Sequence, residues 1–117
     1  MLKKNKRKFD RVDVTNSSYF FMMGDFLKSD SMECWVDNIS LGGISIDVNI
    51  KSKIQIDDVI FISYKLGDEL RKDKVQVKHL FRVINNTRCG CVFLNDDKER
   101  SDLISSYIKY VYMSYND

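Results

Sequence analysis

Apolar side chains recur at every second position along most of this chain, and that spacing is the strongest constraint on its fold. Met32, Cys34 and Val36 alternate with more polar neighbours, and residues 44–48 repeat the pattern. Successive side chains of a β-strand point to opposite faces, so this period of two predicts half-buried strands. Proline and internal repeats are absent, so the elements are located from this period and from turn residues.

Further strands are predicted in the second half of the chain. Residues 59–66 are rich in apolar and aromatic side chains, which indicates a strand buried on both faces or near a barrel closure. A long strand over 75–84 and a short one over 89–94 are expected to form a hairpin around the turn residues 85–87.

The first strand region is less regular. Residues 12–15 and 19–26 are interpreted as one interrupted strand or as two short strands, with a break at 16–18. Gly24 marks a β-bulge in this interpretation.

The pattern changes after Leu94 to helical spacing. Asn95 is the expected N-cap, residues 96–99 are rich in acidic groups that suit a first turn, and Ile104 and Ile108 lie one turn apart. A helix of about four turns is therefore predicted over about 96–113. Six short strands and one helix predict a mostly β fold, a small six-stranded antiparallel barrel with a C-terminal α-helix.

Length and composition indicate one domain. The chain has 117 residues, of which 44% are hydrophobic and 31% charged, as in soluble globular proteins. We assign a basic arm to residues 1–11 and a barrel domain to residues 12–117. No apolar run approaches the roughly 18 residues that span a bilayer, and the arm has no secretory h-region, so stable membrane insertion is not expected and the cytoplasm is the expected location.

Basic and acidic residues are unevenly distributed, although the formal net charge is only +2. Residues 1–11 hold six Lys/Arg against Asp10 alone, a local charge of +5. The other 106 residues carry 13 basic and 16 acidic side chains, or −3. Clustered positive charge attracts phosphates, so the arm is either a site for an anionic partner or a solvated tail.

Cysteine and histidine usage argues against a metal centre and against catalysis. Cys34, Cys89 and Cys91 fit neither a disulfide framework nor a four-ligand zinc site, and strand alternation makes them buried free thiols. His79 is the only histidine, and the sequence has no phosphate-loop motif and no readable serine–histidine–acid arrangement. We expect neither a cofactor nor an enzymatic activity.

Two polar signatures carry the functional prediction. Arg7 and Arg11 lie four positions apart in the basic arm, and Asn38-x-Ser40-x-x-Gly43 precedes an apolar strand pattern. Each guanidinium presents a planar fork of donors that matches phosphate oxygens and the O6/N7 edge of guanine. Either signature alone also suits a bland interpretation, because Asn, Ser and Gly are turn residues and arm arginines are often solvated. Their co-occurrence favours a site for a guanine-bearing phosphodiester.

Together the two signatures and the order of elements resemble the PilZ family, bacterial receptor domains for cyclic di-GMP. Residues 7–11 match its RxxxR motif and residues 38–43 its [D/N]xSxxG motif. The resemblance implies cyclic di-GMP as the ligand, with both arginines on phosphate and guanine and the second motif around one guanine. A lysine before the first arginine adds charge that could accommodate a stacked ligand dimer. The implied ligand-binding residues are Lys6, Arg7, Arg11, Asn38, Ser40, Gly42 and Gly43.

The charged arm and the resemblance together predict how the protein acts. The basic arm is expected to change conformation when the nucleotide binds and to signal to a protein effector in motility or exopolysaccharide control.

Tyr107 is expected in the core, whereas Tyr112 and Tyr115 extend the aromatic stripe of the helix. That surface is a candidate contact for a partner or for a homodimer.

Two rival functions remain at this point. One is a single-stranded nucleic-acid-binding barrel, against which the acidic body argues, so nucleic acid is not the expected partner. The other is a PilZ-like adaptor that has lost its ligand and acts by protein contact. Two further interpretations concern single features. Alternation points Trp35 outward, and it either fills a core gap, which is favoured, or offers a stacking surface at the barrel rim. Arg71, Lys72 and Lys74 form a basic cluster that is interpreted as a solvated loop.

Overall fold

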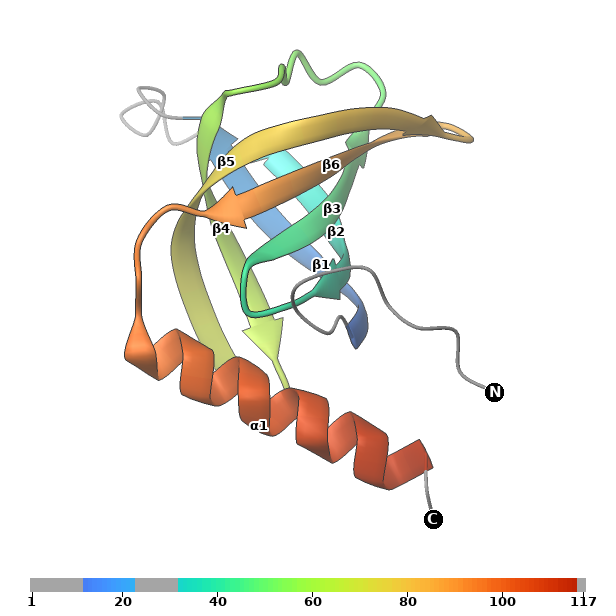
Figure 1. Cartoon of the computed structure of the whole chain (residues 1–117). Helices are drawn as coiled ribbons and strands as arrows, with labels where there is room; N and C mark the ends of the chain where they lie inside the picture. Colours follow the sequence, from blue (N-terminus) through green and yellow to red (C-terminus); the bar gives the residue numbers. More distant parts are fainter. Residues whose placement is uncertain (1–11, 23–31, 116–117) are drawn as a thin grey trace.

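Six antiparallel strands pair in the order β1-β2-β3-β6-β5-β4 and close into a barrel, because β1 pairs with both β2 and β4 (Figure 1). These elements come from a computed structural model that describes residues 12–22 and 32–115. The helix α1 follows the last strand. The predicted fold class is thereby confirmed. The elements are β1 (Val12–Met22), β2 (Met32–Ile39), β3 (Gly43–Asn49), β4 (Val59–Leu66), β5 (Glu69–Val83), β6 (Asn86–Phe93) and α1 (Lys98–Tyr115).

Strand β1 corrects the interpretation of the first strand region. The expected break at residues 16–18 is wrong, since these residues pair with residues 34–36 of β2 inside one continuous strand. A register shift between Asp13 and Asn16 accommodates an irregularity instead. Gly24, the predicted bulge, lies outside the described residues.

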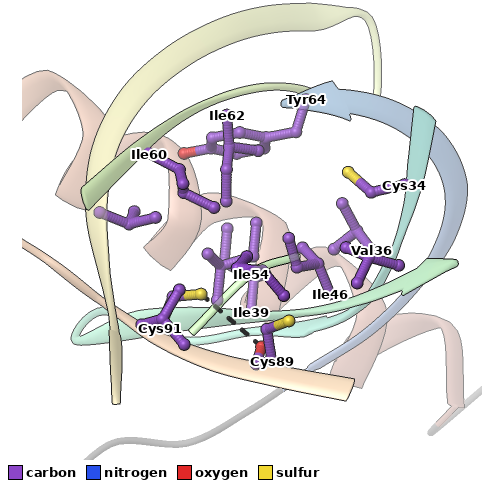
Figure 2. Close-up of a cluster of buried hydrophobic side chains, with 14 of the residues drawn as sticks. Cys34, Val36, Ile39, Ile46, Ile54, Ile60, Ile62, Tyr64, Cys89 and Cys91 are labelled. Atoms are coloured by element: carbon purple, nitrogen blue, oxygen red, sulfur yellow. Dashed lines mark hydrogen bonds between the residues drawn. The ribbon is translucent and has the colours of Figure 1, made fainter. Parts of the chain in front are cut away.

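The barrel interior is filled by the inward-pointing residues of the strands (Figure 2). Side chains at alternate positions of β4 face those of β2, β3 and β6 across the barrel. Cys34, Cys89 and Cys91 belong to this core as buried free thiols, which confirms that expectation. Burial raises the pKa of Cys34 to about 12 and that of Cys89 to about 12, so neither thiol is a ready nucleophile at neutral pH.

Helix α1 covers one end of the barrel, beside the turn between β4 and β5 (Figure 1). Ile104 is fully buried in the core, and Tyr107 and Ile108 pack against it, so the expected core position of Tyr107 is confirmed. The side chains of Tyr112 and Tyr115 lie outside the described part of the structure. Within the described residues, no helix is long and apolar enough to cross a membrane.

The two hairpins that involve β5 have two-residue turns, and these turns differ in backbone strain. Gly67 opens the β4–β5 turn with a φ of +59°, a conformation that glycine adopts without strain. The β5–β6 turn consists of Ile84 and Asn85 rather than the predicted residues 85–87, because Asn86 already pairs with Val83. Ile84 has a φ of +51°, which is strained for a β-branched side chain.

The buried carboxylate of Asp73 accepts hydrogen bonds from three side chains, which come from β4, β5 and α1. Asp73 is 6% exposed and accepts hydrogen bonds from the Tyr64 hydroxyl at 2.7 Å, Arg71 Nε at 3.2 Å and Arg100 Nη1 at 3.1 Å. Arg71 and Asp73 continue the inward alternation of β5. The predicted solvated loop at residues 71–74 is therefore wrong, since these residues belong to a strand.

A second carboxylate connects this group to the start of the helix. Asp97 accepts the Arg100 backbone N–H at 2.9 Å, as an N-cap does, and also accepts Arg71 Nη2 at 2.9 Å. The cap predicted at Asn95 is wrong, because the helix begins at Lys98 and Asn95 instead offers its carbonyl to the Arg100 guanidinium. That guanidinium also lies 4.1 Å from the centre of the Phe93 ring.

Protonation of Asp73 opposes folding. Burial alone raises the pKa of this carboxyl, but hydrogen bonds from Arg71, Tyr64 and Arg100 outweigh burial, so its pKa is below the usual value of 3.8. A carboxyl with a depressed pKa stabilises the folded state above its unfolded-state pKa, and this stabilisation is lost as the pH falls through the folded-state pKa.

Asp73→Asn is expected to lower the free energy of unfolding by about 3–5 kcal/mol at pH 7, because it leaves buried guanidinium groups without their counter-charge. It should also reduce the loss of stability below about pH 4, without abolishing it, because Asp97 has a lowered pKa as well. Urea unfolding at several pH values measures both effects. Asp68→Asn, which removes an exposed carboxylate in the β4–β5 turn, is the matched control. Equal stability of the two variants at pH 7 would show that the Asp73 carboxylate does not stabilise the fold as a counter-charge for these guanidinium groups.

Ile84→Gly is expected to raise the free energy of unfolding by about 0.5–1 kcal/mol, because relief of the left-handed conformation exceeds the entropy that glycine adds to the unfolded chain. Thermal unfolding provides the measurement. The control is Ile56→Gly, at an exposed isoleucine outside the positive-φ positions, which should not stabilise. A lower melting temperature for Ile84→Gly than for the parent would show that Ile84 is not strained.

Candidate functional site

The second polar signature forms the tight turn between β2 and β3. The Ser40 backbone N–H donates to the Gly43 carbonyl at 2.9 Å, and the Ser40 hydroxyl approaches the same oxygen at 3.5 Å. The Gly42 carbonyl accepts the Phe93 N–H at 3.1 Å, which fastens the turn to the end of β6. The structure therefore brings together four of the predicted site residues, Asn38, Ser40, Gly42 and Gly43.

Gly43 has a packing role that the sequence did not reveal. A Cβ atom at this position would lie 2.1 Å from the Cys91 carbonyl oxygen, so β3 and β6 can approach here only with glycine. The neighbouring strand thus requires glycine at position 43, whether or not a ligand also lies near this residue.

A β-bulge turns Asn38 to the outside of the barrel. Val36 pairs with Ile46 and Asn38 with Ser45, so β2 has one extra residue, Asp37, between these pairs. As a result Asp37 and Asn38 are both half-buried on the outer surface, while Val36 and Ile39 are both buried. Strict alternation would place Asn38 on the same face as Val36, so the outward position depends on the bulge.

Asn38 belongs to a polar network on the outer surface. Its amide nitrogen donates to Asp37 at 2.7 Å, and Asp37 pairs with Arg88 Nη2 at 3.3 Å. Arg88 also holds Asp47 with two hydrogen bonds, 2.7 and 3.0 Å long. Hydrogen bonding to Asp47, with the charges of Asp47 and Asp37, raises the pKa of Arg88. This cation sits beside the motif and neutralises part of the acidic charge there.

Sequence reasoning missed the network of Asp37, Asp47 and Arg88. These residues come from three strands, and only the register Asp47 with Arg88 in β3 and β6 brings the latter pair together. Their outward position in alternating strands was the one available signal.

Trp35 lies on the same outer surface, where it pairs with Asp47 of β3. It is 41% exposed, so the favoured interpretation as a filler of a core gap is wrong. An exposed indole next to a polar network is compatible with the alternative interpretation, a stacking surface.

The start of β1 lies directly beside the second motif. Val12 pairs with Ile39 and Asp13 with Asn38, so the strand that follows the basic arm runs along the residues of the motif (Figure 1). The predicted arm residues Lys6, Arg7 and Arg11 lie outside the described residues. Within the described residues, no group of three His, Cys, Asp or Glu side chains could hold a metal ion.

A family profile decides where this protein belongs. The profile of the PilZ domain matches residues 5–110, which include both motifs. This chain is a member of the PilZ family. A search of curated proteins finds no match to the sequence.

Solved PilZ structures share this fold at low sequence identity. The Bacillus subtilis inhibitor of motility MotI/DgrA superposes with a TM-score of 0.74 at 15% identity, over 93% of this chain and 53% of its own. The MrkH–c-di-GMP complex of Klebsiella pneumoniae gives 0.74 at 10% identity, over 97% of this chain and 55% of its own. The PilZ domain of Escherichia coli YcgR with c-di-GMP gives 0.71 at 16% identity, over 97% and 99%. This chain thus spans about half the length of MotI and MrkH and nearly all of the isolated YcgR domain.

Gly43→Ala is expected to lower the free energy of unfolding by about 1–3 kcal/mol, because the added methyl group forces β3 away from the Cys91 carbonyl. Chemical denaturation monitors the loss. Gly90→Ala is the matched control in β6, since its Cβ would meet His79 at an ordinary 3.5 Å. If both alanine variants lost the same stability, the close approach at Gly43 would not be its cause.

Proposed function

We propose that this PilZ domain binds cyclic di-GMP between its basic arm and the β2–β3 turn. The observation that carries the proposal is the pairing of Val12 with Ile39. Because consecutive Cα atoms are about 3.8 Å apart, the chain attaches Arg11 within one residue of this pair. The last residue of the RxxxR motif therefore directly precedes a strand residue that pairs beside the [D/N]xSxxG motif. Solved relatives with this fold, the YcgR domain and MrkH, are complexes with c-di-GMP.

The chemistry of the described residues supports a guanine nucleotide. Asn38 faces outward and has both an amide donor and a carbonyl acceptor for a base edge. Arg88 compensates Asp37 and Asp47, which lowers the repulsion that an anionic ligand would meet there. Arg7 and Arg11 supply the charged forks in this proposal, each bond contributing about 1.5–3 kcal/mol.

The proposed action is an ordering switch in a receptor without enzymatic activity. Ligand phosphates neutralise the mutual repulsion of the basic residues in the arm 1–11, and the ordered arm offers a new surface on the domain 12–117. An effector protein reads that surface, in motility or in exopolysaccharide control, and the receptor acts in the cytoplasm. Lys6 completes the site when a second ligand molecule stacks on the first.

A homodimer through α1 is part of this proposal. Tyr110 and Met113 are 68% and 69% exposed near the end of the helix. Exposed aromatic and methionine side chains are enriched at protein interfaces, so the same surface serves either a second copy or the effector.

Isothermal titration with cyclic di-GMP tests the function. The intact chain should bind, and Arg7→Ala and Arg11→Ala should each weaken binding by about 1–3 kcal/mol, or about tenfold or more. Arg82→Ala removes an exposed arginine from the β5–β6 hairpin and is the matched control with unchanged affinity.

Two outcomes would overturn the proposal. One is the absence of binding heat with the intact, folded chain, and the other is an unchanged affinity in both arm variants. Salt-sensitive binding to oligonucleotides that cyclic di-GMP does not displace would support the nucleic-acid-binding alternative.

A further inference from the structure

The β5–β6 hairpin ends in an exposed apolar tip, at the opposite end of the barrel from α1 (Figure 1). Ile84 is 84% exposed, and Phe81 is 51% exposed three residues earlier. Ile84 also has the positive φ of +51°. A strained β-branched residue that is also left in water contributes nothing to folding, and such positions are often kept for an interaction.

The part of this hairpin around the tip, from residue 74 onward, is free of acidic residues. Residues 74–95 contain four Lys/Arg and neither Asp nor Glu, although the whole chain has 17 acidic side chains. Lys78 pairs with Asp57 at 3.7 Å and Arg88 with Asp47 at 2.7 Å. Arg82, next to the tip, forms no ion pair within the described residues. A further cation lies close by, since Lys51 follows Asn49, the partner of Asn86 at the base of the tip. The apolar tip is therefore flanked by positive charge.

The size and shape of this tip favour a lipid surface over a protein groove. A stable protein interface buries about 800 Å² on each partner, which two apolar side chains on a narrow turn do not supply. Shallow insertion into a membrane needs only a few apolar side chains, with Lys and Arg at the level of anionic headgroups.

We propose that the tip of this hairpin, formed by Phe81, Arg82 and Ile84, docks on an anionic phospholipid surface. Ile84 and Phe81 enter the boundary between headgroups and acyl chains, and Arg82 and Lys51 contact the headgroup phosphates. The β2–β3 turn lies at the opposite end of the barrel (Figure 1), so a docked chain keeps the nucleotide site facing away from the membrane. This docking does not depend on the nucleotide.

Flotation of the full chain with vesicles tests the docking. Binding is expected to vesicles that contain phosphatidylglycerol and not to vesicles of phosphatidylcholine alone. Ile84→Asn should weaken binding about tenfold, because it removes the apolar side chain while asparagine tolerates the positive φ. Leu70→Asn is its control, at a leucine 71% exposed beside the β4–β5 turn, at the other end of the barrel.

Arg82→Gln should weaken binding about fivefold, as expected for one cation at an anionic surface. Lys109→Gln, on an exposed position of α1, controls for the change in net charge. The basic arm is present in every variant, so binding through the arm alone would leave all four variants equal and would overturn the proposal. Absence of binding to phosphatidylglycerol vesicles at low salt would overturn it as well, whereas titration with cyclic di-GMP reports separately on the nucleotide site.

Discussion

The buried carboxylate of Asp73 connects helix α1 to strands β4 and β5 of the barrel. It accepts hydrogen bonds from Tyr64 of β4, Arg71 of β5 and Arg100 of α1, so three elements meet at one charge. Asp97 extends the contact to the first turn of the helix. Such a group is costly to bury alone, but two guanidinium groups and a hydroxyl satisfy it. Helix α1 therefore has a fixed position across the barrel end, and its apolar face closes the core.

Barrel closure and two local irregularities then place the candidate site. Strand β1 pairs with β2 on one side and with β4 on the other, and this double pairing fixes its register, with Val12 beside Ile39. The bulge at Asp37 sends Asn38 outward, and Gly43 lets β3 lie against β6. The site thus depends on backbone geometry at a few positions, while the inward-facing residues provide the rigidity.

Particular residues show which predictions from sequence were sound. Alternation identified the strands and the buried thiols Cys34, Cys89 and Cys91 because burial on one face of a strand is a local, periodic property. The prediction failed for Arg71, which was assigned to a solvated loop because it occurs in a basic cluster. Its side chain turns inward to partners that include Asp97, 26 residues away, and so distant a partner leaves no local signal. Trp35 was likewise misplaced, since the core was favoured although alternation points this side chain outward, where the structure leaves it 41% exposed.

The sequence by itself determined the fold class, the C-terminal helix and the two motifs that mark a PilZ domain, because period, turn residues and short signatures are all local. The tertiary structure alone decided how Asn38 faces outward, why Gly43 is glycine, and that Arg88 compensates the acidic groups beside the motif. Each of these depends on register between strands that are far apart in the chain, and register is fixed only when the barrel closes.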